Sequence, residues 1–95
     1  MHFLYILHSS SANKFYVGET DNIDSRLLKH NNHSYDGSFT KIAEDWRVVL
    51  QFECVSKHQA LQLEKFIKKM KSKIFIQKTI INPEILDDII SKNNF

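Results

Sequence analysis

The spacing of apolar residues changes along the chain and predicts a short series of elements. Residues 2–8 are rich in Phe, Leu, Tyr and Ile, and a polar turn over 9–13 separates them from 14–18. This arrangement is typical of a β-hairpin. Apolar and polar residues alternate over 46–54, which is the period of a strand. The three segments predict a small antiparallel sheet.

Helical spacing follows in the remaining segments. Asn22 or Asp21 can cap a helix over roughly 23–31, and Ser56 begins a capping box that predicts a helix over 57–71. Residues 74–81 are ambiguous between helix and strand, and we favour a helix. A proline in the first turn predicts a last helix within 82–95.

The order of these elements predicts an α+β fold, in which a three-stranded antiparallel sheet is flanked by helices. With 95 residues, 42% of them hydrophobic and 25% charged, the chain has the composition of one globular domain. We expect a single domain over 1–95, with 82–95 as a C-terminal helical extension. The size excludes a large multi-domain enzyme.

Composition also bears on the compartment. The apolar run over 3–7 is far too short for a signal-peptide core or a membrane helix. Cys54 is the single cysteine, so no disulfide can form within the chain, and its place in the alternating strand predicts a core side chain. We expect a cytoplasmic protein without membrane contact.

Charge is segregated along the chain although the net charge is only +2. Six lysines lie between Glu64 and Glu84 with no acid among them: Lys65, Lys68, Lys69, Lys71, Lys73 and Lys78. Such a run either solubilises a helix face or contacts the phosphates of a nucleic acid. The aperiodic loop over 32–45 is long enough to suggest a function as well.

Several polar side chains are candidates for chemistry. Arg26 and His30 share a helix face by their four-residue spacing, away from the Ile23 and Leu27 stripe, and they form either a solvated face or a functional pair. The two phenols of Tyr5 and Tyr16 lie at matching depths of the hairpin, as core aromatics or as groups that contact phosphate or water.

Glu64 also has two interpretations. It lies four residues before Lys68, so it can form a surface ion pair worth under about 0.5 kcal/mol. A hard divalent cation such as Mg²⁺ can equally be held by one carboxylate together with water and substrate phosphates. The carboxylate alone does not distinguish the two.

Taken in order, four stretches resemble the GIY-YIG nuclease domain over about residues 3–78. They are Phe3-Leu4-Tyr5-Ile6-Leu7, Phe15-Tyr16-Val17-Gly18-Glu19-Thr20, Arg26-Leu27-Leu28-Lys29-His30-Asn31, and Ala60-Leu61-Gln62-Leu63-Glu64-Lys65 with Ile67-Lys68. The resemblance is closest to the small stand-alone bacterial members, which are related to the N-terminal domain of the incision subunit of nucleotide excision repair.

The resemblance implies a role for each matching residue. Tyr5 matches the tyrosine of the first motif, Tyr16 and Gly18 match the second, and Arg26 and His30 match the helix. Glu64 then matches the metal-binding glutamate. Thr40 and Lys41 fall where relatives place a Thr followed by a basic residue. The chain departs from the pattern at Phe3-Leu4, at Val17, and at Glu44-Asp45, where many relatives have a proline.

The implied function is a divalent-metal-dependent DNA endonuclease that uses Mg²⁺ or Mn²⁺ and no organic cofactor. We expect Tyr5, Tyr16, Arg26, His30 and Glu64 to be catalytic. Nucleic-acid contacts are expected from Thr40, Lys41, Lys68, Lys69 and Lys71. The alternative is a catalytically weak module that keeps the fold and binds nucleic acid or a partner. A partner protein can supply substrate specificity, and DNA repair is the process that the resemblance implies.

Overall fold

The computed structural model describes residues 1–32 and 39–95, and for Phe39 and Thr40 the backbone only. The elements are β1 (His2–Ser9), β2 (Lys14–Thr20), α1 (Ile23–Asn31), the 3-10 helix η1 (Phe39–Ile42), β3 (Trp46–Cys54), α2 (Lys57–Met70), α3 (Lys73–Ile81) and α4 (Glu84–Asn93). The predicted α+β fold is confirmed. The ambiguous segment is helical, as α3.

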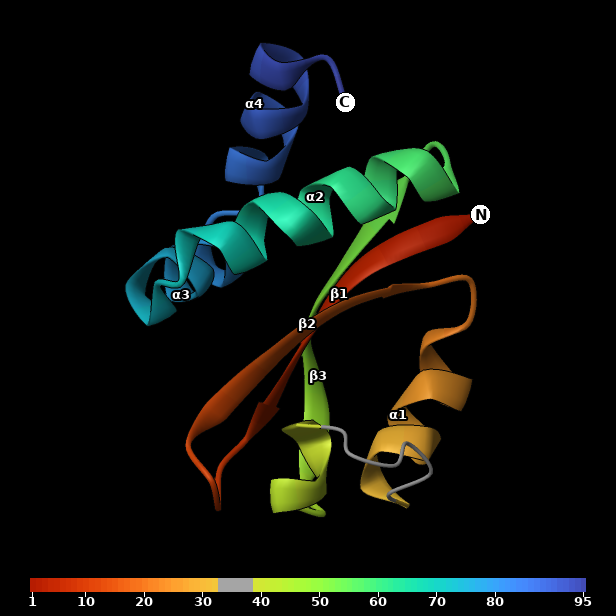
Figure 1. Cartoon of the computed structure of the whole chain (residues 1–95), viewed down its shortest axis with the longest axis vertical. Coiled ribbons are helices and arrows are strands. Elements are labelled where there is room, and N and C mark those ends of the chain that lie inside the picture. The colour runs from red at the N-terminus through yellow and green to blue at the C-terminus, as the bar shows by residue number, and fades with distance from the viewer. Residues whose placement is uncertain (33–38) are drawn as a thin grey trace.

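The three strands form one antiparallel sheet in the order β2-β1-β3. Helix α1 lies on one side of the sheet, whereas α2, α3 and α4 gather on the other side (Figure 1). Because β1 is central, β2 and β3 are the sheet edges. The N-terminal strand is therefore the part of the sheet that both helical layers cover.

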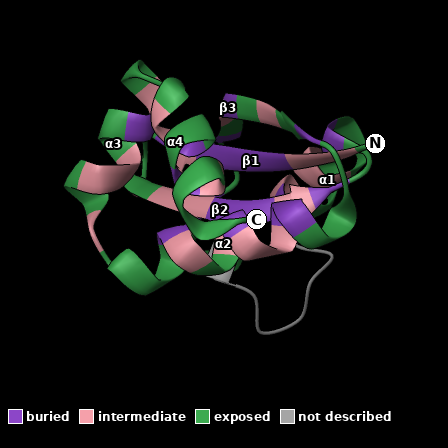
Figure 2. Cartoon of the chain, turned by 90° about the horizontal axis from the view of Figure 1, so that it is seen from above, coloured by how far each residue is buried: buried purple, intermediate pink, exposed green. Residues whose placement is uncertain are grey.

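Successive side chains of β1 point to opposite faces and create two cores. Leu4 and Ile6 pack with residues of α2 and α4, while Tyr5 and Leu7 pack with Ile23 on the α1 side. All four β1 side chains are almost fully buried. Figure 2 shows this burial as purple along the strands, whereas the helices are a mixture of green, pink and purple. A sheet buried on both faces explains why 2–8 alternates poorly between apolar and polar residues.

An irregularity in β3 divides its apolar stripe between the two cores. Ile6 pairs with Leu50 but Leu7 pairs with Val48, so Val49 is an extra residue in the ladder. Such a bulge reverses the facing of every later side chain. Trp46 therefore joins the α1 side, and Cys54 joins the opposite core. The sequence interpretation of one continuous stripe over 46–54 is wrong here.

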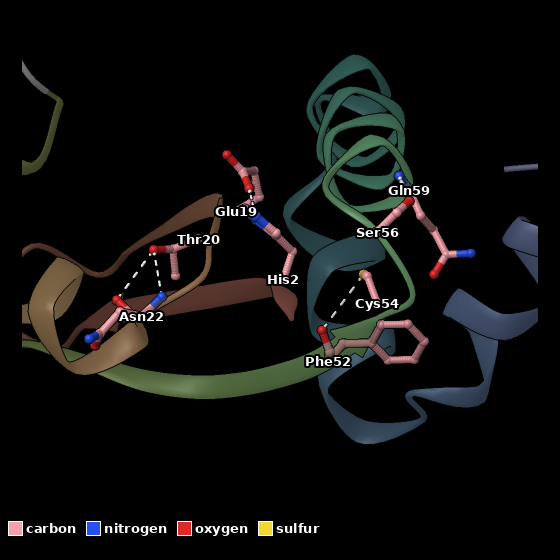
Figure 3. Close-up of polar contacts among 8 residues, drawn as sticks. All are labelled: His2, Glu19, Thr20, Asn22, Phe52, Cys54, Ser56 and Gln59. Atoms are coloured by element: carbon pink, nitrogen blue, oxygen red, sulfur yellow. Dashed lines mark hydrogen bonds and ion pairs between the residues drawn. The ribbon is translucent and has the colours of Figure 1, made fainter.

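Two predicted helix starts are present (Figure 3). Asn22 caps α1 by accepting from the Ser25 amide, and Thr20 in turn accepts from the Asn22 amide. At α2 the Gln59 amide donates to Ser56 Oγ, but the Gln59 side chain accepts from Val55 rather than from Ser56 itself. The capping box is thus shifted by one residue.

Polar side chains also join distant segments. The Asn31 side chain accepts from the Trp46 amide at 2.8 Å and donates to the Trp46 carbonyl at 3.0 Å, which ties the end of α1 to the start of β3. Asp45 accepts hydrogen bonds from Ser9 and Ser11 at the hairpin turn. These bonds lower the pKa of Asp45 to about 2.

Two predictions about the character of the chain can be compared with the fold. Cys54 is buried and has a free thiol, as its strand position predicts. Among the residues that the structure describes, no helix is both long and apolar enough to cross a membrane.

Gly18 is required by close packing. It pairs with Tyr5 across the β1–β2 ladder, and a Cβ added at this position would lie 2.6 Å from the Tyr5 hydroxyl oxygen and 2.7 Å from the ring carbon that bears it. Any larger residue would displace a ring that is 1% exposed. Gly18 therefore fixes where the Tyr5 phenol can lie.

We predict that Gly18→Ala lowers the free energy of unfolding by about 1–3 kcal/mol, because the methyl group overpacks the site. Chemical denaturation measures this cost. The same Gly18→Ala change in a Tyr5→Leu background should cost clearly less, since the clashing phenol is gone. Equal costs in the two backgrounds would show that the ring does not impose the glycine.

Candidate active site

The two phenols and the imidazole of His30 form a cluster on the α1 side of the sheet. Tyr5 Oη lies 3.0 Å from His30 Nε2 in a buried hydrogen bond. The ring centroids of Tyr16 and His30 are 4.6 Å apart, and those of Tyr5 and Tyr16 are 6.3 Å apart. The three rings therefore form one cluster. Tyr5 lies on the central strand of the sheet and Tyr16 on an edge strand.

The strand register explains this arrangement. Tyr5 pairs with Gly18 and Tyr16 pairs with Leu7, so the two phenols are diagonal neighbours on one face. They do not lie directly opposite each other, as matching depths would imply. His30 of α1 packs against both phenols on this face of the sheet.

His30 does not lie on a solvated helix face. It is 1% exposed and belongs to the inner surface of α1 together with Ile23, and Arg26 is half-buried. The expected separation of the Arg26 and His30 face from the apolar stripe is wrong, because residues 23, 26, 27 and 30 all share the inward side of a helix. The sequence pattern therefore did not indicate that the His30 imidazole is buried.

Burial and the nearby charge of Arg26 both lower the pKa of His30, from 6.5 to about 4. Burial is the larger cause. His30 is therefore neutral at pH 7, and one of its ring nitrogens has a lone pair available to accept a proton.

Glu64 lies on α2, which packs on the face of the sheet opposite the phenol cluster. Its carboxylate accepts from Lys68 Nζ at 2.7 Å, and the same ammonium lies 5.4 Å from the centroid of the Tyr16 ring. Because β2 is an edge strand, α2 can approach Tyr16 around the sheet edge. Lys68 thus connects Glu64 with the phenol cluster.

The residues present fit a hard divalent cation held mainly by groups from outside the protein. In the described part of the chain, no three His, Cys, Asp or Glu side chains gather as a ligand set. The Glu64 side chain is 21% exposed and offers carboxylate oxygens, the donor type that Mg²⁺ prefers. A cation on Glu64 would complete its shell with water and phosphate oxygens.

The residues expected to bind nucleic acid lie in different places. Lys68 and Lys71 line a groove between β2 and the α2–α3 pair, whereas Lys69 lines a separate groove between α2 and the C-terminus. Lys41 is exposed in η1, which packs beside α1. Thr40 lies in the same 3-10 helix, and its side chain is outside the described part.

The sequence interpretation missed two features of the site. Lys14 and Phe15 line the same groove as Lys68 and Lys73, although they lie far from both lysines in sequence. Asn31 holds α1 against β3 next to His30. The sequence feature that could have indicated this contact is an Asn at the last position of a helix, directly before a loop.

We predict that the free energy of unfolding falls as the pH is lowered from about 6.5 to about 4. In this window the unfolded state takes up a proton on His30 and the folded state does not. The contribution of His30 to the free energy of unfolding is therefore fully present above pH 6.5 and is lost as the pH falls towards 4. The total loss from this group is at most about 3 kcal/mol. Urea denaturation as a function of pH measures it.

A matched pair of variants isolates the group. His30→Gln cannot titrate and should flatten the slope in this window, while the exposed His58→Gln should leave it unchanged. A slope that survives in His30→Gln would assign the pH dependence to other groups.

One comparison with known proteins gives a match that identifies the family of the chain. The family model of the GIY-YIG catalytic domain matches residues 1–79. No curated protein and no solved structure gives a significant match. The matched region covers the sheet, α1, α2 and every residue of the cluster, with Glu64 included. The chain therefore belongs to the GIY-YIG family of nuclease domains.

Proposed function

We propose that the protein is a divalent-metal-dependent endonuclease that hydrolyses phosphodiester bonds in DNA. The observation that carries this proposal is the buried hydrogen bond between the Tyr5 phenol and His30, a nitrogen base that is neutral at pH 7. Family membership supplies the nuclease class. The metal dependence, the residue roles and the cleavage itself are the proposal.

Arg26 is assigned to the scissile phosphate. A guanidinium can bind two non-bridging oxygens with a planar fork, which a lysine cannot do. Arg26 lies close enough to His30 for its charge to lower the pKa of that imidazole. When a phosphate neutralises Arg26, this part of the effect weakens, and His30 becomes a stronger base at the moment when substrate is bound.

The proton of the attacking water is assigned to the Tyr5–His30 pair. We place the imidazole proton on Nδ1, so that Nε2 accepts the hydrogen bond from the Tyr5 hydroxyl. As Tyr5 Oη takes the water proton, its own proton moves to His30 Nε2, which lies 3.0 Å from Tyr5 Oη. Tyr16 is more exposed than Tyr5 and is assigned to orienting the water or phosphate.

Glu64 is the residue that would hold Mg²⁺ or Mn²⁺. The bound ion supplies charge stabilisation for the leaving oxygen. Lys68 Nζ donates a hydrogen bond to the Glu64 carboxylate in the structure. This hydrogen bond has to break before a cation can bind the same carboxylate oxygen. The freed ammonium lies beside Tyr16, where it can contact the phosphate backbone.

The relation to the excision-repair incision subunit, a role in DNA repair, the cytoplasmic location and a partner that supplies specificity remain predictions. None of them is needed for the residue assignments.

We predict that Glu64→Gln abolishes cleavage in Mg²⁺ or Mn²⁺ while the affinity for DNA stays equal or rises slightly. The change removes a metal ligand and one negative charge near the phosphates. Gel analysis of cleavage products from single-stranded, nicked and branched DNA gives the rate, and fluorescence anisotropy gives the affinity. Glu53→Gln, an exposed acid on β3, is the matched control.

Two other outcomes are informative. If Glu64→Gln cuts as fast as the unmodified chain, Glu64 is only the ion-pair partner of Lys68 and the metal assignment is wrong. If neither protein cuts but both bind DNA, the chain is the catalytically weak binding module that the sequence leaves as the alternative.

We predict that Arg26→Lys lowers the cleavage rate by on the order of 10² or more with little change in DNA affinity. The substitution keeps the charge and loses the two-point contact that develops in the transition state. Single-turnover kinetics at saturating protein separates this rate from binding. A rate within a few-fold of the original would remove Arg26 from the reaction.

A further inference from the structure

A basic groove runs along the free edge of β2, where the strand faces the α2–α3 pair. Its volume is about 460 Å³. Four lysines line it, namely Lys14, Lys68, Lys71 and Lys73, and no acidic side chain of the described residues does. Phe15 and Ile76 contribute apolar wall. We call this feature the edge groove.

Two properties of the edge groove restrict what can fill it. The four lysines come from β2, α2, α3 and the connection between α2 and α3. Positive charge therefore lies on both walls of the groove, which favours a polyanion as the ligand. The wall between them is apolar and aromatic. A DNA duplex presents phosphates, sugars and base edges to such a wall, but not its base faces, which are stacked inside. An unpaired strand presents phosphates and base faces together.

We propose that the edge groove binds a single unpaired DNA strand, with its phosphates on the lysines and a base against Phe15. The proposal rests on the function proposed above and specifies its substrate class: DNA in which the cleaved strand is unpaired beside the scissile phosphate. The Lys73 ammonium lies over the Phe15 ring, 5.9 Å from its centroid, so a base that stacks on Phe15 displaces this ammonium, which is then free to contact a neighbouring phosphate.

The edge groove is continuous with the active site. Tyr16 belongs to both, and Lys68 lines the groove while contacting Glu64 and lying over the Tyr16 ring. A strand held along the groove therefore passes the phenol cluster at Tyr16. The direction of the groove, from Tyr16 towards the hairpin turn at Asn13, gives the path of the strand away from the scissile phosphate.

The test measures binding without catalysis. The full chain carrying Glu64→Gln is titrated in EDTA against a fluorescein-labelled thymidine oligonucleotide and against a duplex of equal length. Anisotropy is read at several salt concentrations. The groove variants are Lys14→Ala/Lys73→Ala and Phe15→Leu. The matched control is Lys57→Ala/Lys65→Ala, which removes two exposed α2 lysines that do not line the groove.

Loss of two phosphate contacts should reduce the slope of log affinity against log salt by about 1.4, and should weaken single-strand binding at 0.1 M salt on the order of 20-fold. Phe15→Leu keeps the salt slope but should cost about fivefold through lost stacking. The control pair should retain most of the affinity, and duplex binding should change little in Phe15→Leu. Thermal melting verifies that each variant is folded.

Three results would overturn the proposal: equal losses in the groove and control pairs, equal loss of single-strand and duplex binding in Phe15→Leu, or tighter binding of the duplex by the parent protein. Binding of a labelled acidic peptide that is lost in the groove variants, with no binding of the oligonucleotide, would assign the groove to a protein strand instead. Groove binding without any cleavage in Mg²⁺ by the chain with Glu64 intact would keep this inference and remove the proposed function.

Discussion

The buried hydrogen bond between Tyr5 and His30 depends on almost every feature of the sheet and its first helix. Tyr5 can lie there only because Gly18, its partner across the ladder, has no side chain. His30 reaches it only because α1 is capped by Asn22 and held at its other end by Asn31. A buried polar pair destabilises the fold unless each member is satisfied, so these constraints select one geometry.

The same burial determines the chemistry. A solvated histidine is largely neutral at pH 7 but exchanges protons freely with water, whereas His30 is kept neutral by desolvation and by the charge of Arg26. In the proposed mechanism only the second influence would change when substrate binds, because a phosphate would neutralise Arg26 without exposing the imidazole. The base strength of His30 would then depend on whether a phosphate is bound at Arg26, and a solvent-exposed histidine would lack this dependence.

Local patterns predicted the elements well, since strands, caps and helical stripes depend on neighbouring residues. They failed where two distant segments decide the outcome. The alternation over 46–54 gives no sign of the bulge at Val49, which appears only when β3 pairs with β1. The spacing of Arg26 and His30 suggested an outward face, because a polar residue was assumed to seek water, yet Tyr5 satisfies His30 inside. The motif match named the residues of the phenol cluster. It did not show that Lys69 lines a different groove from Lys68 and Lys71, because this difference depends on how α2 packs in the fold.

The edge position of β2 brings Lys68 of α2 close to Tyr16, whose ring lies on the α1 side of the sheet. Tyr16 faces the α1 layer, yet it lies on the outermost strand, so α2 can reach its ring around the edge. In a central strand the sheet itself would separate Glu64 from the phenols. An exposed edge strand invites pairing with another chain. Here lysines flank that edge, and their mutual repulsion disfavours a second strand of the same protein while attracting a polyanion. The charges that protect the edge are therefore the same ones that would hold the proposed nucleic-acid strand.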